Sequence, residues 1–438
     1  MSYTTLSAPI TCQIELTSAC NNNCKHCYNF WRSTDCATRT LGTQEIKTII
    51  RKLSNSRVFD IVITGGEPLM AFKSLVECIQ DAKEAGMGVY LNSNLVPLTR
   101  ERAKILKSLG VSYILTSVMG SNAAIHNSIA QRAGAFERVV ENIRLAQEEG
   151  IGVVANMVVS KLNLGDVKNT GRLVHSLGVS KFTATKAGCP GNCPDFSEMS
   201  LDLSEFRQYL GDLCEVGKEL GIEIDALEGY PLCGVKDLDL HNWIVGRKCL
   251  AGVTSMTIAS DGSVRPCSHM DEACGNLLEE DLPDIWLRMG SWRSCDNLPS
   301  TCKSCKLFGV CGGGCRMEAK MHGGHINDSD PYCSSDDVAF SASSLKAHQM
   351  KKKEENADLV SSKSIKVLQH RIRREPFGAT AIGKSRFPAF LNQEGSEILS
   401  SLSVGATYKI NDARISWGSV NSMQFITELV HKGVLELT

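Results

Sequence analysis

Three cysteines lie close together near the start of the chain, in the stretch Cys20-Asn21-Asn22-Asn23-Cys24-Lys25-His26-Cys27-Tyr28. Thiolates are soft ligands that favour iron, and four of them normally hold a cubane iron–sulfur cluster. Because no fourth cysteine follows closely, a cubane on these three thiolates would keep one iron open for an outside ligand. Half of a zinc site, or simply buried thiols, is the alternative interpretation of this stretch.

A second group of cysteines begins at Cys249, which is followed after twelve residues by Gly262 and after four more by Cys267. These spacings are typical of metal ligands, whereas a secreted disulfide framework scatters its cysteines. A reducing cytoplasm is therefore the expected setting. Two structural zinc sites are the alternative for this region. The group continues with Cys302, Cys305, Cys311, Cys315 and Cys333.

The composition argues against several classes of partner. The 438 residues include 47 Lys and Arg and 48 Asp and Glu, which gives a net charge of −1. Binding to nucleic acid or to an anionic membrane requires a strong basic excess, so neither partner is expected. We find no apolar run long enough to span a bilayer, and the first residues lack the basic and apolar regions of a signal peptide.

The first cysteine group follows a predicted strand, and the sequence then alternates helices with strands. Glycine after each helix suits the left-handed position that ends helices. The alternation predicts a parallel sheet with right-handed crossovers, and six units are too few for a complete eight-stranded barrel. The chemistry of parallel barrels lies at the carboxyl ends of the strands, where the cysteine loop and Gly65-Gly66-Glu67-Pro68 both fall. The predicted strands are 11–17, 59–64, 88–92, 111–118, 151–159 and 179–185.

Cys20, Cys24 and Cys27, with the aromatic Tyr28 and the glycine-rich stretch at residues 65–68, resemble the signature of the radical S-adenosylmethionine (SAM) enzymes. The resemblance implies an α/β fold, the radical SAM partial (β/α)6 barrel. It also implies that the three cysteines hold a catalytic 4Fe-4S cluster whose open iron binds the amino and carboxylate groups of SAM. An electron from the cluster would then cleave SAM to a 5′-deoxyadenosyl radical.

The same resemblance assigns residues to the binding of SAM. Gly65-Gly66-Glu67-Pro68 matches the segment that contacts the SAM amino group, and glycine lets a ligand approach the backbone closely. Tyr28 is expected to lie against the adenine. Ser117 and Asn156 stand where the family contacts the ribose and amino-acid moiety, and Arg132 resembles an arginine that pairs with the SAM carboxylate. The alternatives are a plain turn, a core tyrosine, a helix-capping serine and a solvated arginine.

The seven cysteines from Cys249 to Cys333 resemble the SPASM extension of peptide-modifying radical SAM enzymes. The resemblance implies two auxiliary 4Fe-4S clusters. Some relatives add a fourth inner ligand where Ser255 stands here, so the inner cluster is either open-sided or completed by another cysteine, such as Cys233, Cys274 or Cys295. The outer cluster would be held by Cys302, Cys305, Cys311 and Cys333, and the inner cluster by Cys249, Cys267 and Cys315.

The last residues predict a small α+β domain with a hairpin, two helices and a final strand. This pattern resembles the leader-peptide recognition domain of ribosomal-peptide maturases, which binds by strand addition. A winged-helix-like domain for dimerisation or DNA binding is the alternative. The expected division is a radical SAM barrel at 1–188, a connector at 189–248, a SPASM domain at 249–340, a linker at 341–363 and a peptide-recognition-like domain at 364–438.

The resemblances together imply an enzyme that modifies a ribosomally made precursor peptide, forming a crosslink such as a thioether or C–C bond. An electron donor such as flavodoxin or ferredoxin would serve it. One alternative is a maturase of the anaerobic sulfatase type, which forms formylglycine without a leader-binding domain. Another is a non-catalytic metal-cluster protein that binds peptides, which would leave Gly65-Gly66-Glu67-Pro68 unexplained. The residues do not assign an acid or base, although Asp225 and Asp271 are candidates.

Overall fold

The computed structural model describes residues 5–29, 38–188, 194–334, 343, 364–385, 387–409 and 420–438. These residues form two compact units. The larger unit contains the described residues from 11 to 343, and the smaller unit contains residues 5–10 together with those from 364 onward. The predicted linker, 341–363, lies outside the described residues apart from 343. None of the described helices is long and apolar enough to cross a membrane.

The larger unit is built on one ten-stranded sheet in the order β10-β9-β8-β1-β2-β3-β4-β5-β6-β7. Six neighbouring strands, β1 to β6, are parallel and confirm the predicted alternation. They are mostly apolar because both faces of such a sheet are covered. Their bounds are β1 (Thr11–Thr17), β2 (Asp60–Gly65), β3 (Gly88–Asn92), β4 (Tyr113–Ser117), β5 (Gly152–Val159) and β6 (Lys181–Lys186).

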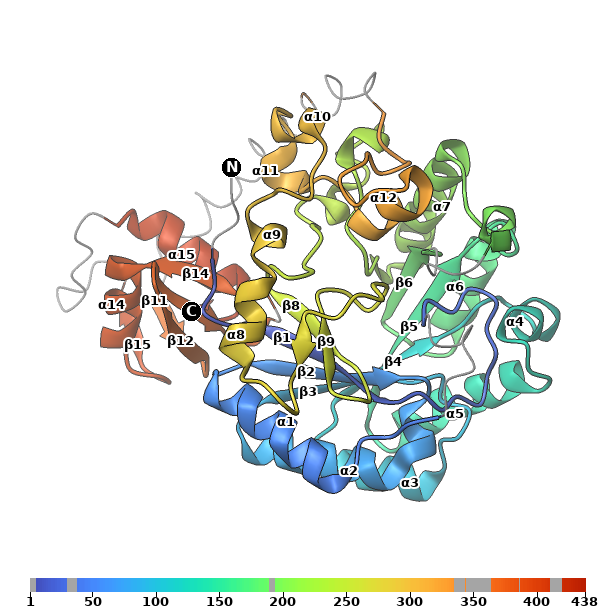
Figure 1. Ribbon diagram of the computed structural model, residues 1–438, viewed down its shortest axis with the longest axis horizontal. Helices are drawn as coiled ribbons and strands as arrows, with labels where there is room; N and C mark the ends of the chain where they lie inside the picture. The colour runs from blue at the N-terminus through green and yellow to red at the C-terminus, as the bar shows by residue number, and fades with distance from the viewer. Residues whose placement is uncertain are drawn as a thin grey trace. The chain divides into compact units, whose positions relative to one another are not determined.

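Helices connect these strands, and Figure 1 shows α1, α2 and α3 along one side of the sheet. Helix α1 buries four isoleucine and leucine side chains at helical spacing, as its sequence predicts. Helix α4, which is only eight residues long and begins after its Asn122 cap, was not predicted. The bounds are α1 (Thr43–Asn55), α2 (Phe72–Glu84), α3 (Arg100–Ser108), α4 (Ala123–Ala130), α5 (Ala135–Glu148), α6 (Val167–Ser176) and α7 (Leu203–Leu220).

The cysteine-rich extension continues the barrel sheet. Strand β8 (Ser255–Ile258) pairs in parallel with β1, and the turn at Gly262 then returns the chain as the antiparallel β9 (Ser263–Arg265), which confirms the predicted hairpin. The extension is therefore hydrogen-bonded to the strand that leads into the first cysteine group. Its other elements are β10 (Gly275–Asn276), α8 (Leu282–Arg288), α9 (Gly290–Arg293), α10 (Ser300–Lys303), α11 (Phe308–Cys311) and α12 (Arg316–Gly323), and β7 (Glu223–Asp225) lies beside β6.

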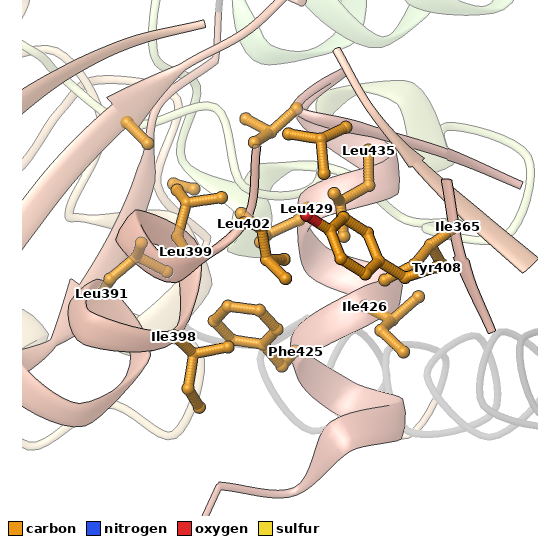
Figure 2. Packing of buried hydrophobic residues seen from close by; sticks show 14 residues of the cluster. Ile365, Leu391, Ile398, Leu399, Leu402, Tyr408, Phe425, Ile426, Leu429 and Leu435 are labelled. Atoms are coloured by element: carbon orange, nitrogen blue, oxygen red, sulfur yellow. The ribbon is translucent and has the colours of Figure 1, made fainter. Parts of the chain in front are cut away.

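The smaller unit has two three-stranded sheets, β15-β11-β16 and β12-β13-β14. Both sheets and both helices contribute to one apolar core, in which Figure 2 shows Phe425 and Tyr408 among leucine and isoleucine side chains. The hairpin, the two helices and the final strand match the prediction. The bounds are β11 (Ser364–Val367), β12 (Arg371–Glu375), β13 (Gly378–Ile382), β14 (Ala389–Asn392), α14 (Gln393–Ser401), β15 (Thr407–Lys409), α15 (Ser422–His431) and β16 (Leu435–Leu437).

Residues 5–10 belong to this smaller unit although β1 of the larger unit follows directly. The buried Arg373 side chain donates to the carbonyl oxygens of Ala8, at 2.7 Å, and Pro9, at 2.8 Å. Its Nε donates to Glu375, whose other carboxylate oxygen accepts from the Ser7 amide at 2.8 Å. The N-terminal segment is thus held to β12 by charge-assisted hydrogen bonds, which are stronger than neutral ones.

Candidate active site and metal-binding cysteines

The glycine-rich stretch lies directly against the residues that precede Cys20. The Gly66 amide donates to the Thr17 carbonyl and the Glu67 amide to the Ala19 carbonyl, both at 2.7 Å. A methyl group on Gly66 would overlap the Ala19 carbonyl oxygen, so only glycine allows this approach. The two sequence motifs therefore meet at the carboxyl ends of β1 and β2, where a parallel barrel places its chemistry.

The Glu67 carboxylate faces inward. It accepts hydrogen bonds from the Leu69 amide, the Ser93 hydroxyl and the Asn94 amide at 2.7–2.9 Å. Burial raises the pKa of Glu67 to about 7, against the opposing effect of these three donors. Asn94 in turn donates to the side chain of Asn21 in the cysteine loop. The Glu67 side chain thus fixes the loop after β3, which supports the cysteine loop.

A second support of the cysteine loop comes from the segment after α4. Arg132 donates to the Asn21 carbonyl at 2.7 Å and is exposed. The amides of Asn23 and Lys25 donate to carbonyls at the end of α4, and Cys24 packs against a small apolar cluster there. The structure therefore places Arg132 next to the first cysteine group, and Cys20, Cys24 and Cys27 are all partly exposed on one loop.

Ser117 and Asn156 are directly paired across β4 and β5, near the carboxyl end of the sheet. The Asn156 side-chain oxygen accepts hydrogen bonds from Thr183 at 2.8 Å and Thr185 at 3.0 Å, both on β6. The structure thus brings these two predicted SAM-binding residues together. The hydrogen bonds also fix the orientation of the Asn156 amide.

Tyr28 contacts a residue that the sequence did not single out. Its ring centroid lies 4.8 Å from that of His269, which follows Cys267 by two residues. A side chain at Gly188 would come within 2.7 Å of the same imidazole, so this glycine leaves room for it. The aromatic residue of the first cysteine group thus meets the extension above the end of β6.

A buried ion pair also joins the barrel to the extension. Arg265 on β9 pairs with Glu15 on β1, and both side chains are 1 % exposed. The same guanidinium donates to the carbonyls of Ser268, at 3.3 Å, and Met270, at 2.8 Å. Arg265 therefore determines the path of the loop that carries Cys267. Burial raises the pKa of Glu15 to about 7, against the opposing charge of Arg265.

The three expected inner ligands lie near one another. Burial raises the pKa of the Cys267 thiol to about 12 and that of Cys315 well above its usual value, and the nearby charge of Cys249 adds to both shifts. The turn at Gly262 pairs β8, which follows Cys249, with β9, which precedes Cys267. A metal ion would reverse these pKa shifts, because coordination deprotonates a thiol.

The four expected outer ligands line a single cavity with a volume of about 270 Å³, including the part that is open to solvent. Cys233, which the sequence offers as a possible inner ligand, lines the same cavity. A cluster of cysteine thiols around one cavity is the donor set that an iron–sulfur cluster requires, so these residues fit the group. Among the described residues, no group of three or more His, Cys, Asp or Glu side chains is placed to hold a single metal ion.

A buried charge network that sequence reasoning missed lies beside the inner cysteines. Lys186, the last residue of β6, forms ion pairs with Glu228 at 3.0 Å and Glu318 at 3.2 Å, and its ammonium lies 5.2 Å from the centre of the Tyr332 ring. Burial lowers the pKa of Lys186, but the two carboxylates hold it well above its ordinary value. The sequence signal that could have indicated Lys186 is its place at the end of a barrel strand, where the functional residues of parallel barrels lie.

Comparison with known proteins identifies the two parts of the larger unit. Residues 14–174 match the Radical SAM superfamily, and residues 249–306 match an iron–sulfur cluster-binding domain named SPASM. The chain is a radical SAM enzyme of the SPASM subfamily. Its radical SAM domain contains the first cysteine group and the glycine-rich stretch, and its cofactors are iron–sulfur clusters and SAM. The SPASM match ends before Cys311, Cys315 and Cys333.

Similar proteins share this architecture. The chain is 28 % identical over 346 residues to an AdoMet-dependent heme synthase of Methanosarcina barkeri, and this match covers 75 % of this chain and 97 % of that protein. It is 28 % identical over 341 residues to a PqqA peptide cyclase of Ruegeria pomeroyi, covering 75 % and 88 %. Streptococcus suis SuiB bound to the precursor peptide SuiA matches with a TM-score of 0.60 and 19 % identity, covering 76 % of each chain. At that identity the SuiB match establishes the fold alone.

Proposed function

We propose that this enzyme modifies a ribosomally made peptide, which the smaller unit recognises, and forms a crosslink such as a thioether or C–C bond. When bound, the cofactors supply reductive cleavage of SAM to a 5′-deoxyadenosyl radical that removes hydrogen from a substrate. The observation that carries the substrate class is the outer edge of β14 in the smaller unit, with which no strand pairs among the described residues. The similarity to a PqqA peptide cyclase and the fold shared with SuiB support this assignment.

The chain's residues take distinct roles in this proposal. The loop after β1 would hold the catalytic cluster, with Gly65-Gly66-Glu67-Pro68, Tyr28, Ser117, Asn156 and Arg132 around SAM. The outer and inner thiols of the extension would hold two auxiliary clusters. A one-electron donor such as flavodoxin or ferredoxin would reduce the catalytic cluster, and the cytoplasm is the compartment that keeps the thiols reduced. The catalytic ligands would be Cys20, Cys24 and Cys27, and the auxiliary ligands Cys249, Cys267, Cys302, Cys305, Cys311, Cys315 and Cys333.

The smaller unit offers an edge to which an extended peptide could add as a strand. Strand β14 is the last strand of its sheet, and among the described residues no strand pairs with its outer edge. The N-terminal segment contacts the opposite edge strand, β12. Phe390 on β14 is 44 % exposed, and its ring lies edge-on to Phe377 at 6.3 Å. Main-chain hydrogen bonds would supply affinity, and the exposed aromatic side chain would supply selectivity.

Replacing Phe390 by aspartate is therefore expected to weaken binding of a full-length precursor peptide. We expect KM for that peptide to rise at least ~10-fold, which corresponds to ~1.4 kcal/mol, while kcat stays within about twofold. Val404→Asp is the matched control, because Val404 is 50 % exposed in the same unit and lies outside the strands. Equal KM values for the two variants would contradict recognition at β14. Point variants are a better test than deletion of residues 364–438, because that deletion would also remove Arg373, which holds residues 5–10 by hydrogen bonds.

The function is tested with anaerobic protein reconstituted with iron and sulfide and supplied with dithionite and SAM. Peptides encoded by short reading frames beside the gene are added in one set of reactions and an iron porphyrin in another. We expect 5′-deoxyadenosine, together with loss of hydrogen from a peptide by mass spectrometry, and neither from the Cys20→Ala/Cys24→Ala/Cys27→Ala variant. A fully iron-loaded wild type that forms no 5′-deoxyadenosine would contradict the proposal.

Porphyrin modification is the second candidate function. Its support is the match to a heme synthase over 97 % of that protein's length. If only the iron porphyrin loses hydrogen or carbon dioxide while 5′-deoxyadenosine forms, this second candidate replaces the first. The smaller unit would then need a role other than peptide recognition.

A further inference from the structure

The cavity that holds the expected outer ligands is lined by five cysteines, one more than a cubane requires. Four of them come from the extension. The fifth, Cys233, lies in the short 3-10 helix η5 (Leu232–Gly234), before the extension begins. Neither the family match at residues 249–306 nor the spacing of the seven cysteines includes it.

Close backbone contacts position Cys233 at this cavity. Gly234 lies so near Tyr332 that a methyl group on it would overlap the Tyr332 carbonyl oxygen. The Leu232 amide donates to the Cys311 sulfur at 3.3 Å, and Arg207 donates to the Gly234 carbonyl at 2.8 Å. These contacts fix η5 against two segments that carry outer cysteines.

The thiol of Cys233 is grouped with three of the outer thiols. Cys233 and Cys302 both raise the pKa of the Cys333 thiol, which indicates that the three side chains lie near one another, and all three line the cavity. The nearby charges of Cys233 and Cys302 both raise the pKa of Cys311. Cys233, Cys302, Cys311 and Cys333 thus line one cavity although they come from separate segments.

The thiol of Cys305 has different surroundings. It accepts a hydrogen bond from the Leu307 amide at 3.4 Å. Its side chain packs against the apolar cluster of Cys295, Leu298 and Phe308 at the cavity wall. Cys233 thus lines the same cavity as the four expected ligands, and Cys305 differs from it in packing against apolar side chains.

We propose that Cys233 is a ligand of the outer cluster and can take the place of Cys305 in its set of four thiolates. This inference rests on the outer cluster of the proposed function. It adds the connector to the metal-binding part of the chain, and it makes the outer site one with five available thiolates.

The test uses the full chain in the Cys20→Ala/Cys24→Ala/Cys27→Ala background, so that only auxiliary clusters contribute. Iron and sulfide per chain are measured, with Mössbauer spectra and EPR after reduction. We expect Cys305→Ala to keep its iron, and Cys233→Ala/Cys305→Ala to lose about four irons per chain. Cys78→Ala/Cys305→Ala is the matched control, since Cys78 is buried on α2 and lies outside the cavity, and it is expected to keep its iron.

Two results would overturn the assignment of Cys233. One is loss of about four irons from Cys305→Ala alone, and the other is an unchanged iron content and spectrum in Cys233→Ala/Cys305→Ala. Circular dichroism and gel filtration show whether each variant is folded. A folded background protein that takes up no iron would instead overturn the auxiliary clusters of the proposed function, and the role of Cys233 with them.

Discussion

Replacing Gly66 by alanine is expected to lower SAM cleavage at least ~100-fold, which is the typical consequence of displacing a reacting group by about 1 Å. The added methyl group would overlap the Ala19 carbonyl oxygen, and Ala19 directly precedes Cys20. The Gly66 and Glu67 amides would lose their hydrogen bonds to Thr17 and Ala19 as the strands separate. We expect 5′-deoxyadenosine formation to fall. We also expect the iron content to fall by about four irons per chain, which are those of the catalytic cluster.

Gly211→Ala is the matched control for this substitution. Gly211 lies within α7, and a methyl group there would meet no other atom within 4 Å. Alanine should stabilise the helix by ~0.5–1 kcal/mol and leave SAM cleavage unchanged. If Gly66→Ala kept wild-type cleavage and iron content, the close approach of the two motifs would not be required for activity.

Replacing Arg265 by methionine is expected to lower the free energy of unfolding by ~3–5 kcal/mol, the cost of leaving a buried charge without its partner. The Glu15 carboxylate would remain buried on β1. The carbonyls of Ser268 and Met270 would lose their donor, so the loop that carries Cys267 would lose its fixed path. We expect a lower melting temperature and loss of the inner-cluster EPR signal.

Two further variants separate charge burial from the position of the loop. Arg288→Met breaks the exposed ion pair with Glu280 and should leave the melting temperature almost unchanged, because solvent screens exposed charges. Glu15→Leu/Arg265→Met removes both buried charges, so much of the stability should return. The inner-cluster signal should stay low, because the guanidinium is still missing. Recovery of that signal in the double variant would show that Arg265 does not position Cys267.

The parallel core of the barrel was predictable because its signals are local. Apolar strands alternate with amphipathic helices, and a glycine in the left-handed conformation follows α2, α3, α5 and α6, at Gly86, Gly110, Gly150 and Gly178. The hairpin at Asp261 and Gly262 and the hairpin of the smaller unit were predictable for the same reason. The cysteine spacings likewise indicate two groups of metal ligands.

Other features depend on contacts between distant residues, which local patterns do not encode. The pairing of β8 with β1 joins residues 244 positions apart, and the Glu15–Arg265 ion pair spans 250 residues. Cys233 has no cysteine at a metal-ligand spacing, so its place beside Cys333 could not be predicted. The same holds for Lys186, whose partners Glu228 and Glu318 come from separate segments.

The hydrogen bonds of Arg373 to Ala8 and Pro9 also set an order of events during synthesis. They join residues 365 and 364 positions apart. At the ~5–20 residues per second of translation, the N-terminal segment waits roughly 20–70 s for its partner. Leu6 and Ile10, which are almost fully buried in the finished protein, stay exposed to water for that time. A nascent chain that stalls before residue 364 therefore presents these apolar residues to chaperones and proteases, and the smaller unit can form only after β16 is made.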